Sequence, residues 1–232
     1  MKRQTALLLR KSHRYLGLFL GIQFLMWTIS GLYFSWTNID EIHGDNFKVL
    51  PPTLHSFDSL ISPTTLKNLQ AIQSISLREI DAEPYYWINK KELYHAQTGE
   101  LKKGISEIEA LNIAKRYIKK NMLVKDIQLI KKTDNHHEYR GRLLPAYVIS
   151  YQNTGAVKAY ISVKDGAFQT VRHRSWRWFD FLWMTHTMDY QGRDNINTLT
   201  LRIFSFLGLI TVLSGFLLWF VSSPSVRKIK KR

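Results

Sequence analysis

Histidine is the main candidate for ligand chemistry in this chain, because the sequence has eight histidines and no cysteine. An imidazole nitrogen can bind a metal or a haem iron, and it exchanges a proton near neutral pH. Without cysteine, the chain itself offers neither thiolate-bound haem nor ligands for an iron–sulfur cluster. The sequence also lacks a Ser/His/Asp set, a Walker loop and an H-E-x-x-H zinc motif. Histidine ligation is therefore the chemistry that the composition leaves open.

Three of the histidines lie beside long apolar segments. His13 precedes the first segment, His43 follows it, and His186 precedes the second. The other five are spread through the polar middle of the chain, at His55, His95, His136, His137 and His173. A haem held by two histidines needs both ring nitrogens within about 2 Å of one iron. The elements that carry the three histidines beside the apolar segments thus decide which of them can act together.

The two apolar segments are long enough to cross a membrane. Residues 15–36 and 199–221 each number about 22, and a rise of about 1.5 Å per residue lets either one span a hydrocarbon core of about 30 Å. The first follows a basic stretch, but it is too long for the apolar region of a signal peptide and has no A-x-A-like site at its outer end. We interpret it as an uncleaved anchor. The sequence therefore predicts two transmembrane helices embedded in a lipid bilayer.

Charge is distributed so that both ends of the chain should face the same side of the membrane. All eighteen acidic residues lie between Asp40 and Asp194, although the formal net charge is +15. The charged residues of the tails outside the apolar segments are all basic, namely Lys2, Arg3, Arg10, Lys11, Arg14, Arg227, Lys228, Lys230, Lys231 and Arg232. Since Lys and Arg beside a span are retained in the cytoplasm, we expect an inner (cytoplasmic) membrane protein with both termini cytoplasmic and the central domain periplasmic or extracellular. Basic residues gathered beside spans, and not on a folded face, disfavour a nucleic-acid partner.

Small and polar residues within the spans indicate helix packing. Gly17 and Gly21 form a G-x-x-x-G pair in the first span. One face of the second carries Gly208, Thr211 and Gly215. We expect the two helices to pack together, while Gly17 and Gly21 equally suit a second copy of the chain, which would form a homodimer. Gln23, near the middle of the first span, is expected to bond a neighbouring helix.

The stretch of about 160 residues between the spans reads as a repeated α+β unit. Ser62 and Pro63 begin a run at helical spacing to about Ile72, and Ser106 with Glu109 forms a capping box at the start of a second helix. Strand-like runs follow each helix, at 75–80, 85–89 and 92–96 and then at 126–130, 146–151 and 156–163. Each unit is thus a helix on one face of a short antiparallel sheet. The polar stretch 131–142 reads as a loop insertion in the second unit.

Several parts of the chain resemble the PepSY-associated transmembrane helix family. The run KSHRYLGLFLGIQFLMWTISGLYFSW at 11–36 is similar to that family's first membrane helix, with its His-Arg at the inner edge and its Ser-Gly near the outer end. The two helix-and-strand units resemble PepSY domains, and LWMTHTMDY at 182–190 resembles the histidine-bearing stretch before the family's last helix. The resemblance covers nearly the whole chain and implies a PepSY domain-containing, iron-regulated inner-membrane protein.

The expected fold is an α+β periplasmic domain of two PepSY-like units held by two transmembrane α-helices. Its divisions are a cytoplasmic basic tail at 1–14, transmembrane helix 1 at 15–36, the first PepSY-like unit at 37–103, the second at 104–173, an interfacial aromatic helix and connector at 174–198, transmembrane helix 2 at 199–221 and a second cytoplasmic basic tail at 222–232. Some longer relatives in the family are haem-containing reductases that release iron from siderophores, and free PepSY domains are associated with inhibition or regulation of peptidases. Those reductases have four spans, whereas this chain has two. A single copy of this chain therefore lacks some of the helices that could hold haem.

The predicted topology sorts the candidate ligands of a haem b group by depth. His13 lies at the inner edge of the first span, whereas His43 and His186 lie beyond the outer face. The first span interposes about 33 Å, so His13 cannot share an iron with either outer histidine. His43 and His186 can meet if 175–190, whose aromatic residues are interrupted by charges at three-residue spacing, folds back as an interfacial helix. The same aromatic residues suit lipid contact or packing under the domain. The alternative site is a pair of His13 side chains in a symmetric dimer through Gly17 and Gly21.

A second chemistry is suggested by the acidic residues around His43. Asp40, Glu41 and Asp45, joined by Asp189, could bind a divalent or ferric ion together with the imidazole. A short acidic stretch after a span is more often simply solvated, and we favour that interpretation, so no metal site is predicted.

Two functions remain open after these steps. One is a role in iron-linked or haem-linked electron transfer at the cell envelope, as a component of a haem-dependent ferric or siderophore reductase with a redox partner. The other is a non-enzymatic PepSY anchor that binds or regulates a peptidase or another envelope protein. The family resemblance favours the first, and the count of two spans stands against it.

Overall fold

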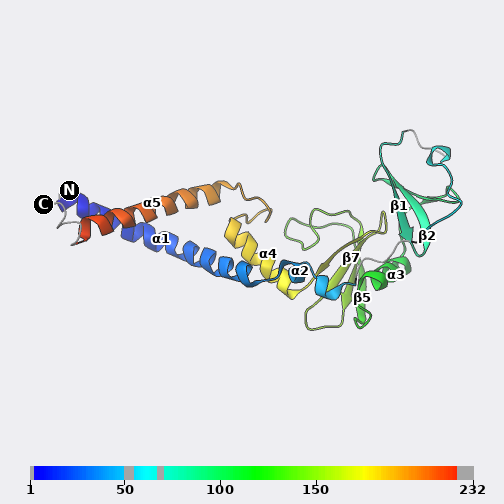
Figure 1. Ribbon diagram of the computed structural model, residues 1–232, viewed down its shortest axis with the longest axis horizontal. Helices are drawn as coiled ribbons and strands as arrows, with labels where there is room; N and C mark the ends of the chain where they lie inside the picture. The colour runs from blue at the N-terminus through cyan, green and yellow to red at the C-terminus, as the bar shows by residue number, and fades with distance from the viewer. Residues whose placement is uncertain (1–2, 50–54, 67–70, 224–232) are drawn as a thin grey trace. The chain divides into compact units, whose positions relative to one another are not determined.

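The computed structural model describes residues 3–49, 55–66 and 71–223, and Figure 1 draws its helices and strands. The chain forms two compact units. The helical unit consists of Met1–Trp36 and Asp180–Arg232, and the sheet unit is Thr37–Phe179. The predicted basic tail at 222–232 lies, beyond residue 223, outside the described residues. The finer division of the central domain into 37–103 and 104–173 stays a prediction.

The helical unit is built on two helices that are long and apolar enough to cross a membrane, as predicted. These are α1 (Arg3–Trp36), whose candidate span is Leu7–Trp36, and α5 (Leu199–Ser222). Most of their large apolar side chains point away from the protein, and Leu18 and Ile22 are each 75% exposed. A core helix of a water-soluble protein would bury such residues. Their outward surfaces therefore require lipid or a partner chain.

The helices α1 and α5 pack against each other through the small residues of α5. A Cβ atom added at Gly208 would lie 3.1 Å from Phe24 Cζ, and one added at Gly215 would lie 3.2 Å from His13 Cε1. Thr211, between them, is buried. The predicted packing of the two helices is thus confirmed, and the two helices run antiparallel. Gly17 takes no part in it, because a Cβ added there would meet nothing within 4 Å.

A third helix fills the space where α1 and α5 separate. Helix α4 (Arg174–Thr187) confirms the helix predicted over this stretch, and its last residues, from Asp180 on, belong to the helical unit. Figure 1 shows this end of α4 between the diverging ends of α1 and α5. A buried ion pair of Asp180 with Arg193 ties α4 to the connector that leads into α5. The end of α1 toward Trp36 is therefore covered by the last turns of α4.

The sheet unit contains two antiparallel four-stranded meanders. The first has the order β1 (Ile75–Ile80), β2 (Glu83–Ile88), β3 (Glu92–His95) and β4 (Leu101–Lys102). The second has the order β5 (Val124–Ile130), β6 (Ala146–Tyr151), β7 (Lys158–Ser162) and β8 (Phe168–Arg172). Six of these strands correspond to predicted runs, whereas the short β4 and the edge strand β8 were not predicted. The predicted α+β class is confirmed at this level.

One helix, α3 (Glu107–Tyr117), supports the core that both sheets share. Its start is the predicted capping box, in which Ser106 accepts from the Glu109 backbone N–H and the Glu109 carboxylate accepts from the Ser106 N–H. Its apolar face buries Ala110 and Ile113 at helical spacing. The same core contains side chains from both sheets, among them Ile80, Trp87, Leu93, Ile149, Ala159 and Val171.

The predicted helix from Ser62 to about Ile72 is wrong in the part that the structure describes. Pro63–Thr65 is a single 3-10 turn, and the next residue, Leu66, is extended. The Thr65 hydroxyl donates to the Ser62 carbonyl, so a local side-chain bond replaces the helical pattern. Leu66 is buried against the face of the first sheet that α3 does not cover. Residues 67–70 of the predicted helix lie outside the described residues.

The predicted loop 131–142 is more than a polar insertion. Its Tyr139 is fully buried and stacks on Tyr160 of β7, with ring centroids 4.8 Å apart. Glu138 accepts hydrogen bonds from the Tyr160 hydroxyl and from Arg177. The loop therefore covers the face of the second sheet opposite α3.

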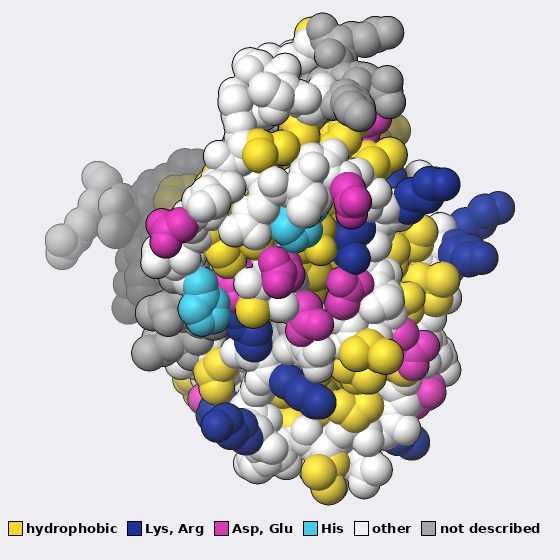
Figure 2. All heavy atoms as spheres, turned by 90° about the vertical axis from the view of Figure 1, so that its right-hand side faces the viewer, with side chains coloured by type: hydrophobic (Ala, Val, Ile, Leu, Met, Phe, Trp, Pro, Cys, Tyr) yellow, Lys and Arg dark blue, Asp and Glu magenta, His cyan; other side chains and the backbone are white. Residues whose placement is uncertain are grey.

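Figure 2 shows acidic, basic and apolar side chains interspersed on one face of the sheet unit, without a large patch of one sign.

Candidate functional site

The end of α4 is anchored to α1 by side chains that reach its last carbonyl groups. Trp27 Nε1 donates to the His186 carbonyl at 2.8 Å, and Gln23 Nε2 donates to the Thr185 carbonyl at 3.2 Å. The last carbonyls of a helix have no partner within the helix and must be satisfied elsewhere when water is excluded. Gln23 thus bonds a neighbouring helix, as predicted. These two bonds fix the position of His186 against α1.

The imidazole of His186 is oriented by Ser30. The distance from His186 Nδ1 to Ser30 Oγ is 2.7 Å, and Ser30 is fully buried. The Ser30 oxygen also lies 2.7 Å from the Met26 carbonyl oxygen and 3.1 Å from that of Trp27. When the hydroxyl donates to one of these carbonyls, its oxygen accepts a hydrogen bond from His186 Nδ1–H. This tautomer leaves an unprotonated Nε2, which is the form of imidazole that binds a metal.

Aromatic side chains surround the His186 ring. The ring of Phe34 lies 5.7 Å from it and that of Trp27 lies 6.4 Å from it, measured between centroids. Trp183, one turn earlier in α4, packs edge-on against Phe34 at 5.9 Å. Such walls exclude water and suit a flat apolar group such as a porphyrin.

His13, near the other end of the helix pair, has the same arrangement. Its Nδ1 lies 2.7 Å from Ser214 Oγ, and the Ser214 hydroxyl donates to the Thr211 carbonyl at 2.7 Å. When the hydroxyl donates to the Thr211 carbonyl, its oxygen accepts from His13 Nδ1–H, and Nε2 is then unprotonated. The His13 ring lies over Gly215, where the absence of a Cβ leaves room for it. Both histidines thus have a serine hydroxyl at Nδ1.

The imidazoles of His13 and His186 lie at two different levels along the axis of α1, one at each level. Ser30, beside His186, is seventeen residues after His13 on α1, which corresponds to about 25 Å along the helix. Within the described part of the chain, Nε2 of neither histidine has a hydrogen-bond partner. Either imidazole could therefore supply one ligand of a haem, and the helical unit contains no other histidine. His186 lies beside Ser30, two turns before α1 ends at Trp36, whereas it had been expected beyond that end.

His43 lies in the other unit. It caps α2 (Ile39–Ile42), is exposed, and lines a hollow of the sheet unit. Its predicted pairing with His186 stays a prediction, because the two residues belong to separate compact units. The buried histidine of this region is His173, whose Nε2 lies 3.1 Å from the Ile42 carbonyl and whose pKa is lowered by burial. His173 therefore holds the segment after α1 against the sheet.

Two of the acidic residues considered as metal ligands, Asp45 and Asp189, have other partners. Asp45 pairs with Lys48 at 2.7 Å. The Asp189 carboxylate accepts from the backbone N–H groups of Gly192 at 3.0 Å and Asn195 at 2.8 Å. Burial alone would raise the pKa of Asp189, but these bonds lower it. Among the residues that the structure describes, no three His, Cys, Asp or Glu side chains gather as a metal site.

The two serines were missed as functional residues, although Ser30 had a sequence signal. The Ser30-Gly31 pair belongs to the stretch that resembles the PepSY-associated family, but a serine in a span does not reveal its partner. Ser214 follows Thr211 on the small face of α5, and its position alone suggested only packing. Comparison of the chain with protein-family models, with curated proteins and with solved structures finds no match. Membership of the PepSY-associated family stays a prediction.

Proposed function

We propose that this protein is a membrane-anchored component of haem-linked electron transfer at the cell envelope, with His13 and His186 as axial ligands of haem b. The observation that carries the proposal is the matching arrangement of the two histidines. Each has its Nδ1 2.7 Å from a serine hydroxyl oxygen that can accept the Nδ1 proton, which would leave Nε2 as the ligand nitrogen, and the two lie about 25 Å apart along α1. Two such levels cover most of a hydrocarbon core of about 30 Å, as a route for electrons across a bilayer requires.

The proposed topology has two spans, with both termini in the cytoplasm and the sheet unit outside. The basic residues before the first span and after the second support this orientation. It places His13 toward the inner edge of the membrane and His186 toward the outer edge. A route through these levels would connect the cytoplasm to the side on which the sheet unit lies, where it could serve a ferric or siderophore reductase.

The second axial ligand at the inner level is assigned to the same residue of a second copy. Gly17 and Gly21 are not covered by α5, since a Cβ at either position would meet nothing within 4 Å. A G-x-x-x-G face permits close approach of a second helix, and it lies one turn from His13. A symmetric dimer would thus bring the two His13 side chains near each other. When bound, haem supplies reversible one-electron chemistry, and the chain's part is to hold its iron and exclude water.

The visible spectrum of the protein tests this proposal. The full chain should be produced with haem supplementation and purified in a mild detergent, and its absorption should be recorded in the oxidised and reduced states. We expect a Soret band that shifts on reduction. The absence of Soret absorption after haem supplementation would overturn the proposed function.

A second function is favoured by the sheet unit, which has an exposed edge strand suited to a protein partner. Strand β5 lies at one edge of its sheet, and Leu129 and Val124 on it are 44% and 37% exposed. An extended peptide of a peptidase or another envelope protein could add to such an edge. On this alternative, the partner should co-purify with the protein even when His13, His43 and His186 are all replaced by alanine.

A further inference from the structure

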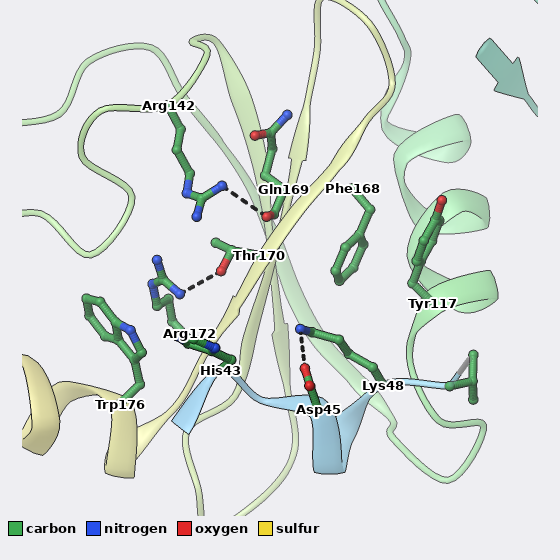
Figure 3. Close-up of a pocket in the computed structure, with 11 residues that line it drawn as sticks. His43, Asp45, Lys48, Tyr117, Arg142, Phe168, Gln169, Thr170, Arg172 and Trp176 are labelled. Atoms are coloured by element: carbon green, nitrogen blue, oxygen red, sulfur yellow. Dashed lines mark hydrogen bonds and ion pairs between the residues drawn. The ribbon is translucent and has the colours of Figure 1, made fainter. Parts of the chain in front are cut away.

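The sheet unit contains a hollow of about 820 Å³ whose walls differ in chemistry. Figure 3 shows guanidinium groups of Arg142 and Arg172 on one side, near Trp176, and the rings of Phe168 and Tyr117 on the other. The last two rings are stacked, with centroids 4.6 Å apart. This volume is in the usual range of small-molecule sites. The hollow belongs entirely to the sheet unit and is independent of the two histidines in the helical unit.

Arg172 is a buried and well-oriented cation. It is only 9% exposed, its Nε donates to the Glu138 carbonyl at 2.9 Å, and one terminal nitrogen donates to Thr170 Oγ1 at 2.6 Å. Its guanidinium carbon lies 4.0 Å from the centroid of the Trp176 ring. These contacts leave its other terminal nitrogen without a hydrogen-bond partner among the described residues. Arg172 is thus held in one position with a donor to spare.

Arg142 reaches the same hollow from the loop that follows β5. One terminal nitrogen donates to the Gln169 carbonyl on the open edge of β8 at 3.1 Å. The remaining donors of this exposed side chain have no partner within the described ranges. A guanidinium that only protected a strand edge would need no second cation beside it. The approach of Arg142 to a buried arginine therefore calls for a further explanation.

The positive charge of the two arginines is not balanced inside the hollow. The one acid that lines it, Asp45, is paired with Lys48. Glu138 is engaged with Arg177, and neither Arg142 nor Arg172 forms an ion pair in the described part of the chain. Burial, followed by the charge of Arg142, lowers the pKa of Arg172 to about 10. A bound anion would relieve both effects, since guanidinium groups match the geometry of carboxylate and phosphate oxygens.

We propose that this hollow binds a small soluble anion that carries a carboxylate or phosphate group on a flat apolar body. The oxyanion would accept from the free donors of Arg142 and Arg172. The apolar body would lie toward the stacked rings of Phe168 and Tyr117. The two walls of the hollow together define this ligand class, because neither an inorganic anion nor a neutral aromatic molecule would use both.

Calorimetric titration of the full-length protein in a neutral detergent tests the proposal. The probes are phenyl phosphate, benzoate and inorganic phosphate, with benzyl alcohol as the neutral aromatic control. We expect phenyl phosphate or benzoate to bind at least ten-fold more tightly than inorganic phosphate and benzyl alcohol. Equal binding of all four probes, or no binding at millimolar concentrations, would refute the site.

The Arg142→Gln variant locates the binding. Arg142 is exposed, so its replacement should leave the fold intact, as an unchanged melting temperature would verify. We expect affinity for the aryl anion to fall at least ten-fold in Arg142→Gln and to recover in part in Arg142→Lys. Lys164→Gln, which removes an exposed charge from the turn before β8, should bind as the unaltered protein does. Wild-type affinity in Arg142→Gln would contradict the assignment.

A lipid headgroup could supply the same oxyanion, and the membrane composition separates the two sources. The phenyl phosphate titration should be repeated in nanodiscs of phosphatidylcholine, with and without phosphatidylglycerol. Equal affinity in both would support a soluble ligand, whereas competition by phosphatidylglycerol would assign the hollow to lipid and overturn the proposal. Loss of haem in His186→Ala should leave this binding unchanged, so the site and the proposed electron transfer can fail separately.

Discussion

The imidazole Nδ1 of His186 lies 2.7 Å from the hydroxyl oxygen of Ser30, and that hydroxyl already donates its proton to the Met26 carbonyl. With the hydroxyl donating to Met26, this bond places an imidazole proton on Nδ1. It leaves Nε2 as an unprotonated nitrogen among aromatic side chains at the junction of α1 and α4. An imidazole in this arrangement can serve as a ligand of a metal or haem iron, as the proposed function requires.

Replacing Ser30 should weaken haem binding at the outer level. In Ser30→Ala, His186 Nδ1–H loses its acceptor, and the ring is no longer held in one tautomer and orientation. Loss of such a supporting bond typically lowers metal affinity about 10–100-fold. Haem titration of the apoprotein measures the change. Ser30→Thr, which keeps the hydroxyl, should restore most of the affinity, and equal affinity of Ser30→Ala and the unaltered protein would refute the role of this bond.

Replacing Gly17 should separate dimerisation from packing within the chain. A Cβ added at Gly17 would meet nothing within 4 Å, so we expect α1 and α5 still to pack in Gly17→Leu. The leucine would keep a second copy from approaching closely, and the protein should become monomeric and lose haem at the inner level. Light scattering of the purified protein measures the oligomeric state. A variant that stays dimeric with its haem content unchanged would show that the dimer does not form through this face.

The stability of the sheet unit should depend on pH through Glu138. Burial alone would raise the pKa of this carboxylate, but hydrogen bonds from Arg177 and Tyr160 and the charge of Arg177 lower it below the ordinary value of about 4.5. Because the folded pKa is depressed, the stabilisation is present above about pH 4.5 and is lost as the pH falls through the folded pKa. Glu138→Gln should therefore cost about 1.5–3 kcal/mol at pH 7 and less at low pH.

Chemical unfolding followed by tryptophan fluorescence measures this dependence, with Glu100→Gln as a control that removes an exposed carboxylate. The free energy of unfolding of the control should differ little from that of the unaltered protein at either pH. A destabilisation by Glu138→Gln that is the same at pH 7 and at low pH would show that its ionised form is not what stabilises the fold.

The proposed orientation in the membrane can be tested with reporter fusions. A reporter active only outside the cytoplasm should be active when inserted beside Gly99, in the turn between β3 and β4, and inactive when fused after Arg232. The reason is the retention of the basic tails on the cytoplasmic side. Activity at the C-terminus alone would reverse the orientation and exchange the inner and outer levels of the two histidines.

Regular patterns in the sequence predicted much of the fold. Apolar length indicated α1 and α5, and the capping box of Ser106 with Glu109 marked the start of α3, because these signals are local. The helix after Ser62 was wrong because Leu66 leaves the helical path to pack on the first sheet. Tertiary packing overrode the local spacing there. The edge strand β8 was missed because a short run ending in a buried arginine lacks the usual strand pattern.

The candidate sites were only partly predictable from the sequence, because tertiary packing brings their residues together. His13 and His186 stood out by their residue type beside apolar segments. Their serine partners lie more than 150 positions away in the sequence, at separations of 201 for His13 and 156 for His186. The convergence of Arg142 with Arg172 likewise depends on a loop folding back over β8. Such pairs arise from tertiary structure, which one sequence does not display.

Haem content per chain is the most direct measurement of the central claim. The haem in equal amounts of purified protein should be quantified as its pyridine complex for the unaltered chain, for His13→Ala, for His186→Ala, for the double variant with both replacements and for the control His55→Ala. The His55 imidazole is exposed and bonds Glu79. We predict that each of the first two variants loses part of the haem, that the double variant loses all of it, and that the control loses none. Full haem content in the double variant, or no haem in the unaltered protein, would contradict the proposal that these two histidines hold it.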